Sequence, residues 1–549
     1  MARTSSTKSK DPIERVRQKQ LSFNKNWKPN TFLRYLPIIL LSTVTWFLLW
    51  CFVQPLFGPN EYYIDEEFHV PQARRYCQAE FYKWDPKITT LPGLYLLSTV
   101  VLLPCMTIIN SILSLVGIFS NDFLHNYDPC SLFALRAVNA VGAPACLYYA
   151  YHRCQLLLSQ KKNIKSPNAE LSYIVLAMNV ATFPVIYAPY SMLYYTDAWA
   201  TASVFLWYSY HLNKNTNLWI EIILGGFCVL CRQTNIAWLV FASIIDVCHC
   251  TEECFLTLKK SVSTYSYIQV SVAELYNCCT VKQKNNKTVR LIDFLRKCWH
   301  STCSNVIVIG SFVISIVLLN NGDIVVGDRQ AHTPIFHPMQ LCYFMVFVLG
   351  FSMPWLLSQA YFKIQTSKSA IIHLKIINIL NQIQNNIPKI ILFTILLTVT
   401  FGLVYSNTIA HPYLLADNRH YTFYVWRLLF GPGKLIFLRY LPVPLYAYGL
   451  YFVDLKLTQS SIAYKLAYWL VTPLILCAQF LLEPRYFVVP YLMYRLHSNI
   501  NNVNNYTIKA ALIEFIVYQI INIIIMWIFL YRPFISTMDN TGRLDRFTW

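Results

Sequence analysis

Charged side chains are scarce in this sequence. Only 13% of its 549 residues are Asp, Glu, Lys or Arg, whereas a soluble globular protein carries about a quarter. Glycine is scarce too, with 15 residues in the whole chain. The glycine-rich patterns that bind nucleotides and the HExxH pattern of metalloproteases are absent from the sequence. These absences argue against a soluble protein and against an enzyme that holds a free nucleotide in such a loop.

Apolar residues dominate instead. They make up 56% of the chain, and the mean hydropathy is +0.39. Apolar runs of roughly 18 to 25 residues recur, which is the length that crosses the hydrocarbon core of a bilayer. The alternating ten-residue segments of a transmembrane β-barrel are absent from the sequence. The pattern predicts an all-α polytopic membrane protein with about 12 to 13 transmembrane helices.

The net charge of +19 is unevenly distributed. Residues 1–35 hold nine basic and two acidic residues, and residues 251–300 hold eight basic and four acidic ones. Basic loops beside membrane spans face the cytoplasm, which argues against nucleic acid as the partner. We therefore expect a cytoplasmic tail over 1–35, a multispanning membrane domain over 36–531 with a cytoplasmic loop at 251–300, and a C-terminal tail over 532–549.

Two polar loops fall on the opposite, luminal side in this scheme. The first span delivers residues 55–90 there, and a later span delivers residues 407–430. The apolar run at about 91–117 satisfies the charge rule only if it lies in the membrane interface or re-enters the bilayer. The remaining polar clusters also sort to this face, which predicts one active or binding face opposite the cytosol. The side of the C-terminus depends on a short segment near 486–496 and stays open.

The first luminal loop contains the densest acidic cluster, "YIDEEFHVPQARRYC". Asp65, Glu66 and Glu67 are followed there by His69, and aromatic residues flank the group. A solvated loop would carry such acids without any function. The aromatic flanks favour a helix against the membrane interface, where one carboxylate can act as a general base once its neighbours tune its pKa.

Further candidates lie where predicted spans end. Tyr195 and Asp197 belong to "LYYTDAW", Arg232 to "CRQTN", and Glu483 and Arg485 to "LLEPRYF". Interfacial aromatics and ion pairs within a loop explain these residues as readily as ligand binding does. Arg232 is also suited to pairing with an acid or with a phosphate.

The second strong block is "HPYLLADNRHYTFYVWR" in the loop at 407–430. An arginine fork beside histidines suits a phosphate, and the adjacent aromatics suit a lipid chain or a sugar face. A hydrated loop with interfacial aromatics is the alternative. The candidate binding residues of this block are His411, Asp417, Asn418, Arg419, His420, Tyr421 and Arg427.

The 17 cysteines are scattered, and many fall inside spans, where a free thiol behaves as a small hydrophobe. "CHC" at 248–250, with Cys254 close by, has a loose resemblance to a metal site. These ligands are too close in sequence for a standard zinc site. We expect no metal and no cofactor.

Taken together, these blocks resemble those of the endoplasmic-reticulum α-1,2-glucosyltransferase family, from about residue 35 onward. "IDEEFHVPQARRYC", "LYYTD", "CRQTN", "NGDIVVGD", "HPYLLADNRHYTFYVWR" and "LLEPRYF" carry the resemblance. It implies a C-type glycosyltransferase fold with a luminal active site and an interfacial luminal helix. It also implies dolichyl-phosphate glucose as donor and the diglucosylated dolichyl-diphosphate oligosaccharide as acceptor. Glu67 and Arg74 depart from the usual pattern of the family.

The resemblance points to Asp65 as the essential acid, with Glu66 beside it, and the two are not distinguished further. An inverting displacement needs one base, while arginines stabilise the departing phosphate. A transporter or flippase of lipid-linked sugars is the alternative, although such proteins show internal repeats. A sister transferase that uses another dolichol-linked sugar is a closer one. Sequons at Asn286 and Asn505 are expected on the cytosolic side.

Overall fold

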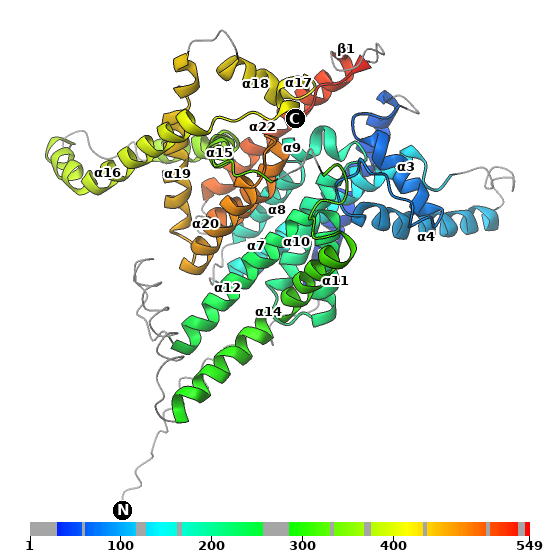
Figure 1. The fold of residues 1–549 in the computed structure, drawn as a ribbon, viewed down its shortest axis with the longest axis horizontal. Coiled ribbons are helices and arrows are strands. Elements are labelled where there is room, and N and C mark those ends of the chain that lie inside the picture. The colour runs from blue at the N-terminus through cyan, green and yellow to red at the C-terminus, as the bar shows by residue number, and fades with distance from the viewer. Residues whose placement is uncertain are drawn as a thin grey trace, which may run out of the picture.

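The chain folds as a bundle of helices (Figure 1). The structure is a computed structural model, and it describes residues 30–57, 61–116, 128–161, 167–255, 285–329, 334–366, 375–431, 436–500, 505–535 and 544–549. Most of the predicted cytoplasmic tail and residues 256–284 of the predicted basic loop lie outside the described residues. Among the described residues, the strands are a short antiparallel pair, β1 (Phe534–Ile535) and β2 (Leu544–Asp545).

Helices follow one another along the described chain. In the first half they are α2 (Asn30–Val53), η1 (Gln54–Leu56), α3 (Glu66–Cys77), α4 (Gly93–Val116), α6 (Leu132–Ala137), η2 (Val138–Gly142), α7 (Ala143–Lys161), α8 (Pro167–Ala181), α9 (Pro184–Ile186), η3 (Tyr187–Ser191), α10 (Thr196–His211), α11 (Leu218–Cys231), η4 (Gln233–Asn235) and α12 (Ile236–Phe255). In the second half they are α14 (Asn285–Leu319), α15 (Met339–Thr366), α16 (Lys375–Asn407), α17 (Pro412–Ala416), α18 (Tyr421–Phe430), η5 (Ile436–Tyr440), α19 (Val443–Leu457), α20 (Ile462–Cys477), η6 (Pro484–Phe487), α21 (Val488–Ile500) and α22 (Asn505–Tyr531).

Several of these helices have the length and composition of membrane spans. Among the described residues there are six such stretches, and shorter apolar helices accompany them. The prediction of an all-α polytopic membrane protein is therefore confirmed, while the number of 12 to 13 crossings stays a prediction. The six stretches are Ala169–Ser191, Gln233–Cys254, Ile292–Leu319, Met339–Phe362, Pro388–Asn407 and Thr507–Tyr531.

The bundle has two distinct ends. α12 and α14 pack along each other, and they run together toward the bottom of Figure 1. The short helices α17 and α18 and the C-terminus lie at the top. α4 extends sideways from the bundle at the right, and the interfacial placement of 91–117 stays a prediction. α17, α18 and the C-terminus therefore lie at the opposite end of the bundle from the lower ends of α12 and α14.

The start of α4 is anchored by a close backbone approach. A Cβ atom on Gly93 would lie 2.5 Å from the backbone nitrogen of Cys231, so only glycine fits here. Gln233 donates a side-chain hydrogen bond to the carbonyl of Thr89 at 2.7 Å. These contacts fasten the loop before α4 to the end of α11.

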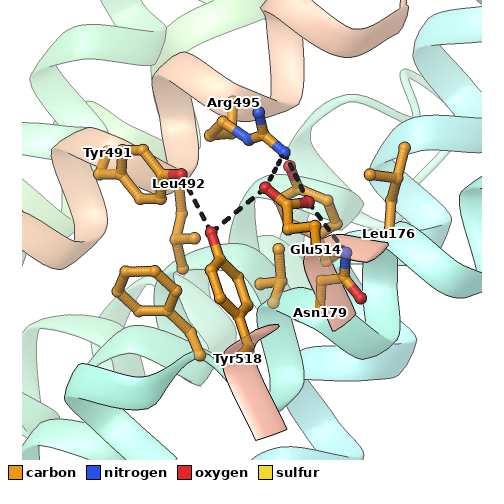
Figure 2. Close-up of a pocket in the computed structure, with 10 residues that line it drawn as sticks. Leu176, Asn179, Tyr491, Leu492, Arg495, Glu514 and Tyr518 are labelled. Carbon is orange, nitrogen blue, oxygen red and sulfur yellow. Dashed lines mark hydrogen bonds and ion pairs between the residues drawn. The ribbon is translucent and has the colours of Figure 1, made fainter. Parts of the chain in front are cut away.

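A buried polar cluster joins helices inside the bundle (Figure 2). Arg495 of α21 donates through Nη2 to both carboxylate oxygens of Glu514 on α22, at 2.7 and 2.8 Å. Asn179 of α8 donates to the same carboxylate at 2.9 Å, and Tyr518 donates to the carbonyl of Phe351 on α15 at 2.8 Å. Because an unpaired charge inside a membrane is costly, this pairing fixes α8, α21 and α22 relative to one another.

Replacing Glu514 by Gln is expected to lower the stability of the folded protein. The change leaves the buried guanidinium of Arg495 without its counter-charge, which costs about 3–5 kcal/mol when one partner of a buried pair is lost. The measurement is the melting temperature of the purified protein in detergent. Glu253→Gln is the matched control, because the Glu253 side chain is 60% exposed. Equal melting temperatures for the two variants would contradict this role.

Candidate active site

The acidic cluster lies at the start of α3. Asp65 is the residue before the helix, and Glu66 and Glu67 form its first turn. Carboxylates are stabilised there because the amino end of a helix carries partial positive charge. The preceding residue, Ile64, has a φ of +57°, which is strained for a β-branched side chain. The chain therefore turns sharply at Ile64 to present Asp65.

Glu66 is locked into the protein interior. It is fully buried, and its carboxylate accepts hydrogen bonds from Arg136 Nε at 2.9 Å and Nη2 at 2.6 Å. The backbone N–H groups of Tyr63 and Tyr194 also donate to it, at 3.1 and 2.7 Å. Both carboxylate oxygens are therefore engaged. The sequence analysis missed Arg136, for which a lone arginine inside an apolar run was the available signal.

Asp65 is held differently. Its side chain is partly exposed, and its backbone N–H donates to the hydroxyl of Tyr195 at 2.7 Å. Within the described part of the chain, its carboxylate takes part in no hydrogen bond or ion pair. Of the two adjacent acids, Asp65 is thus the one whose carboxylate is open to a ligand.

His69 lies beside this carboxylate, one turn along α3. Its ring is 5.9 Å from the ring of Tyr195, and its Nδ1 lies 2.6 Å from the hydroxyl of Tyr95. Burial lowers the pKa of His69 below its ordinary value of 6.5, although the charge of Asp65 opposes the shift. His69 is therefore neutral at neutral pH.

A network of two arginines and two acids forms the next part of the site. Asp197, in the first turn of α10, accepts hydrogen bonds from Arg232 and, at 3.2 Å, from Arg485 Nη1. Arg485 also donates to Glu483 through Nε and Nη2. Burial alone would raise the pKa of Asp197, but the two guanidinium groups lower it below its ordinary 3.8. The sequence blocks "LYYTD", "CRQTN" and "LLEPRYF" therefore meet in space.

The loop at 417–420 forms another part of the site. Arg419 donates to both oxygens of Asp417, from Nε at 2.9 Å and from Nη2 at 2.7 Å. The ring of His420 points its Nε2 at the same carboxylate, 3.5 Å away. Asn418 Oδ1 and the hydroxyl of Tyr421 are buried without a hydrogen-bond partner among the described residues. Such buried polar atoms are rare in proteins and are available to a polar ligand.

Electrostatic coupling joins these parts into one cluster. The hydrogen bonds that Arg419 donates to Asp417 raise the pKa of Arg419, and the charge of Asp65 acts in the same direction. Burial raises the pKa of Glu483, but Arg485 and then His420 lower it below its ordinary 4.5. Asp65 and the loop at 417–420 thus lie within electrostatic reach of each other.

Two candidates of the same block are placed differently. His411 accepts a hydrogen bond from the backbone N–H of Tyr413 at 3.0 Å and caps α17. Arg427 is exposed in the last turn of α18, where its charge lies beside Tyr424. His411 therefore has a structural role in this conformation, and Arg427 lies on the outer surface of its helix.

A disulfide bond closes the far end of α3. Cys77, the last residue of the helix, is bonded to Cys130, with 6.6 Å between their Cα atoms. The sequence analysis treated the cysteines as scattered thiols, because a pair 53 residues apart gives no local pattern. Disulfides form in oxidising compartments such as the endoplasmic reticulum lumen.

The comparison with protein families identifies the chain. A model of the DIE2/ALG10 family matches residues 59–496. The chain belongs to this family. The matched stretch begins before Asp65 and ends within α21, so it contains every candidate site residue named above.

Curated members of the family are similar over most of their length. A human protein named Dol-P-Glc:Glc(2)Man(9)GlcNAc(2)-PP-Dol alpha-1,2-glucosyltransferase is 33% identical over 511 residues, which is 92% of this chain and 97% of the relative. Proteins with the same name from Drosophila melanogaster (31% over 458 residues, 81% of this chain and 86% of the relative) and Arabidopsis thaliana (28% over 521 residues, 89% and 95%) are also similar. No solved structure matches the chain.

The lowered pKa values predict how stability depends on pH. Because Asp197 and Glu483 have lower pKa values in the folded protein, their contribution is complete above the ordinary values of 3.8 and 4.5 and is lost as the pH falls through the lowered ones. The loss of this contribution should therefore lower the melting temperature only below about pH 4.5. In Arg232→Gln the fall in acid should be smaller, because one of the two guanidinium groups that lower the pKa of Asp197 is gone and its folded-state pKa moves up toward the ordinary value. A fall of unchanged size in this variant would refute the prediction.

Proposed function

We propose that this chain transfers glucose from dolichyl-phosphate glucose, in α-1,2 linkage, to the diglucosylated dolichyl-diphosphate oligosaccharide. The observation that carries the proposal is the open carboxylate of Asp65 within electrostatic reach of Arg419, in a member of the DIE2/ALG10 family. Relatives from animals and plants bear the name of this activity. Their names give no support to the alternative of a transporter or flippase.

Asp65 is the general base in this proposal. Its carboxylate takes the proton from the 2-hydroxyl of the acceptor's terminal glucose while that oxygen bonds to C1 of the donor glucose. The bond from C1 to the phosphate oxygen breaks on the opposite face, so the configuration at C1 is inverted. Glu66 has the role of a positioning residue, because its carboxylate is already saturated by Arg136 and two backbone N–H groups.

Arg419 and His420 stabilise the departing phosphate in the same scheme. Arg419 uses Nε and Nη2 for Asp417, which leaves the N–H groups of Nη1 for the phosphate oxygens. Donors held in place before the reaction are worth more than donors that must be reoriented. The positions of His411 and Arg427 give them less support as phosphate ligands. The arginines supply the positive charge, so the reaction as proposed needs no metal.

The remaining candidates are assigned to substrate binding. His69 and Tyr195 flank the base, and the paired charges of Asp197, Arg232, Glu483 and Arg485 present a polar surface next to it. Sugar hydroxyls both donate and accept hydrogen bonds, so a surface of alternating charges suits them. The unsatisfied atoms of Asn418 and Tyr421 add two further hydrogen-bonding positions.

We place this site in the lumen of the endoplasmic reticulum. Two observations support the assignment: the basic loops that flank the spans on the other side, and the Cys77–Cys130 disulfide beside the acidic cluster. A lipid-linked donor also removes the need for a nucleotide sugar on this face. Membrane-impermeant maleimide should label Cys77 in reduced microsomes only after the vesicles are opened, and labelling in sealed vesicles would reverse the orientation.

The proposed function is tested by measuring glucose transfer by the purified protein. The protein, reconstituted in liposomes, is given radiolabelled dolichyl-phosphate glucose and the diglucosylated lipid-linked acceptor, and the released oligosaccharide is analysed by chromatography. We expect one added glucose that α-1,2-specific digestion removes. Dolichyl-phosphate mannose serves as the control donor. Transfer of mannose but not glucose, or addition to a shorter acceptor, would overturn the proposal.

A further inference from the structure

Residues 544–549, "LDRFTW", pack directly onto the loop that carries Arg419 and His420. The backbone N–H of Thr548 donates to the carbonyl of Arg419 at 2.9 Å, and the N–H of Tyr421 donates to the carbonyl of Thr548 at 3.0 Å. His420 and Thr548 thereby form a parallel β-bridge. The sequence analysis assigned these residues to a tail, and the family match ends before them, at residue 496.

Trp549 fixes the orientation of the His420 ring. Its backbone oxygen lies 2.6 Å from His420 Nδ1 and accepts a hydrogen bond from the hydroxyl of Tyr190 at 3.1 Å. Because this oxygen has no proton to donate, His420 must carry a hydrogen on Nδ1. Its Nε2 is then the atom that faces Asp417 and the interior of the site.

The indole of Trp549 anchors this oxygen to the bundle. Its Nε1–H faces two backbone oxygens, that of Pro184 at 3.0 Å and that of Ala188 at 3.1 Å. Its ring packs edge-on against Phe351 and Tyr421. The position of the backbone oxygen therefore depends on the indole N–H as well as on the ring.

Arg546 links the same segment to the acidic cluster. Its Nη1 donates to the carbonyl of Phe529 at the end of α22, at 2.9 Å, and its guanidinium lies over the ring of Tyr63 at 5.6 Å. Tyr63 is two residues before Asp65. One short segment thus contacts both halves of the site.

We propose that residues 544–549 are a positioning element for the donor's phosphate, which hold Arg419 and His420 at a fixed place opposite Asp65. This inference rests on the proposed function, since it takes the phosphate to bind at Arg419 and His420. The residues themselves need not touch the substrate. Loss of residues 544–549 weakens donor binding, because the ligand must then order the flexible side chains of Arg419 and His420.

Trp549→Phe tests this inference, because it keeps a ring and removes the indole N–H. The expected result is a rise of about fivefold in the KM for dolichyl-phosphate glucose, of the size of one lost hydrogen bond, with an unchanged KM for the acceptor. Arg546→Gln is a second variant that leaves the segment's backbone intact. Trp527→Phe is the matched control, because Trp527 lies exposed on α22.

A purely structural role predicts a different result. It would lower the amount of folded enzyme and hence the maximal rate, with both KM values unchanged, and that outcome would overturn the inference. The affinity of the same purified proteins for dolichyl phosphate is measured as well, because this readout distinguishes a failure of the inference from a failure of the proposed function. Failure of the unaltered protein to transfer glucose would reject the function, whereas equal dolichyl phosphate affinity in Trp549→Phe and the unaltered protein would reject the positioning role.

Discussion

Replacing Asp65 by Asn is expected to abolish glucose transfer while the protein stays folded and inserted in the membrane. The amide cannot take a proton from the attacking hydroxyl, and loss of a general base lowers rates by about 10²- to 10⁴-fold. The fold should tolerate the change, because among the described residues Asp65 is held through its backbone N–H. The measurement is transfer by the reconstituted variant, together with its melting temperature.

Glu67→Gln is the matched control for this experiment. It removes one carboxylate from the same helical turn, and Glu67 is exposed whereas Glu66 is buried. Its transfer rate should remain within about twofold of the unaltered protein. A normal rate in Asp65→Asn would end the assignment of the base, and an equal loss in both variants would show that the charge of the turn matters rather than one carboxylate.

Replacing Glu66 by Gln is expected to destabilise the protein and to lower transfer as well. The change leaves Arg136 buried without a counter-charge, and breaking a buried pair from one side costs about 3–5 kcal/mol. Gln also has a single acceptor oxygen, so the backbone N–H groups of Tyr63 and Tyr194, which bond to different oxygens of Glu66, can no longer both be satisfied. Tyr194 stands next to Tyr195, which holds Asp65. The measurement is the melting temperature in detergent and the transfer rate per folded molecule.

A double replacement separates the two effects. In Glu66→Met/Arg136→Met the buried charges are both removed, and apolar pairs can replace a buried ion pair at little cost in stability. We expect the melting temperature to recover toward that of the unaltered protein while transfer stays low. A normal melting temperature in Glu66→Gln alone would contradict the structural role of the pair.

The sequence predicted the parts of the site that lie within short segments. His69 lies on the helix that begins directly after Asp65, four residues along the chain, and Asp417, Arg419 and His420 share one loop. Such groups stand out because charges cluster in an otherwise apolar chain. The all-α membrane fold was predictable for the same reason, from the length of the apolar runs.

Other parts depend on contacts between distant segments. Arg136 is 70 residues from Glu66, so the sequence could not show which of the two adjacent acids is buried and which is open. Thr548 and Trp549 act through backbone atoms, and a backbone hydrogen bond leaves no trace in residue type. Arg232 and Arg485 both pair with Asp197, and the three residues come from separate segments of the chain, so the sequence likewise could not show this pairing.

α3 is fastened at both of its ends to the same neighbouring stretch of chain. The Cys77–Cys130 bond holds its last residue, and the pair of Glu66 with Arg136 on α6 holds its first turn. Insertions or deletions between residues 116 and 128 should therefore leave Asp65 in register, since the two fastenings bypass that connection. The stretch 78–92 does not share this freedom, because Gln72 of α3 donates to the carbonyl of Lys83 and Gln233 of η4 donates to that of Thr89.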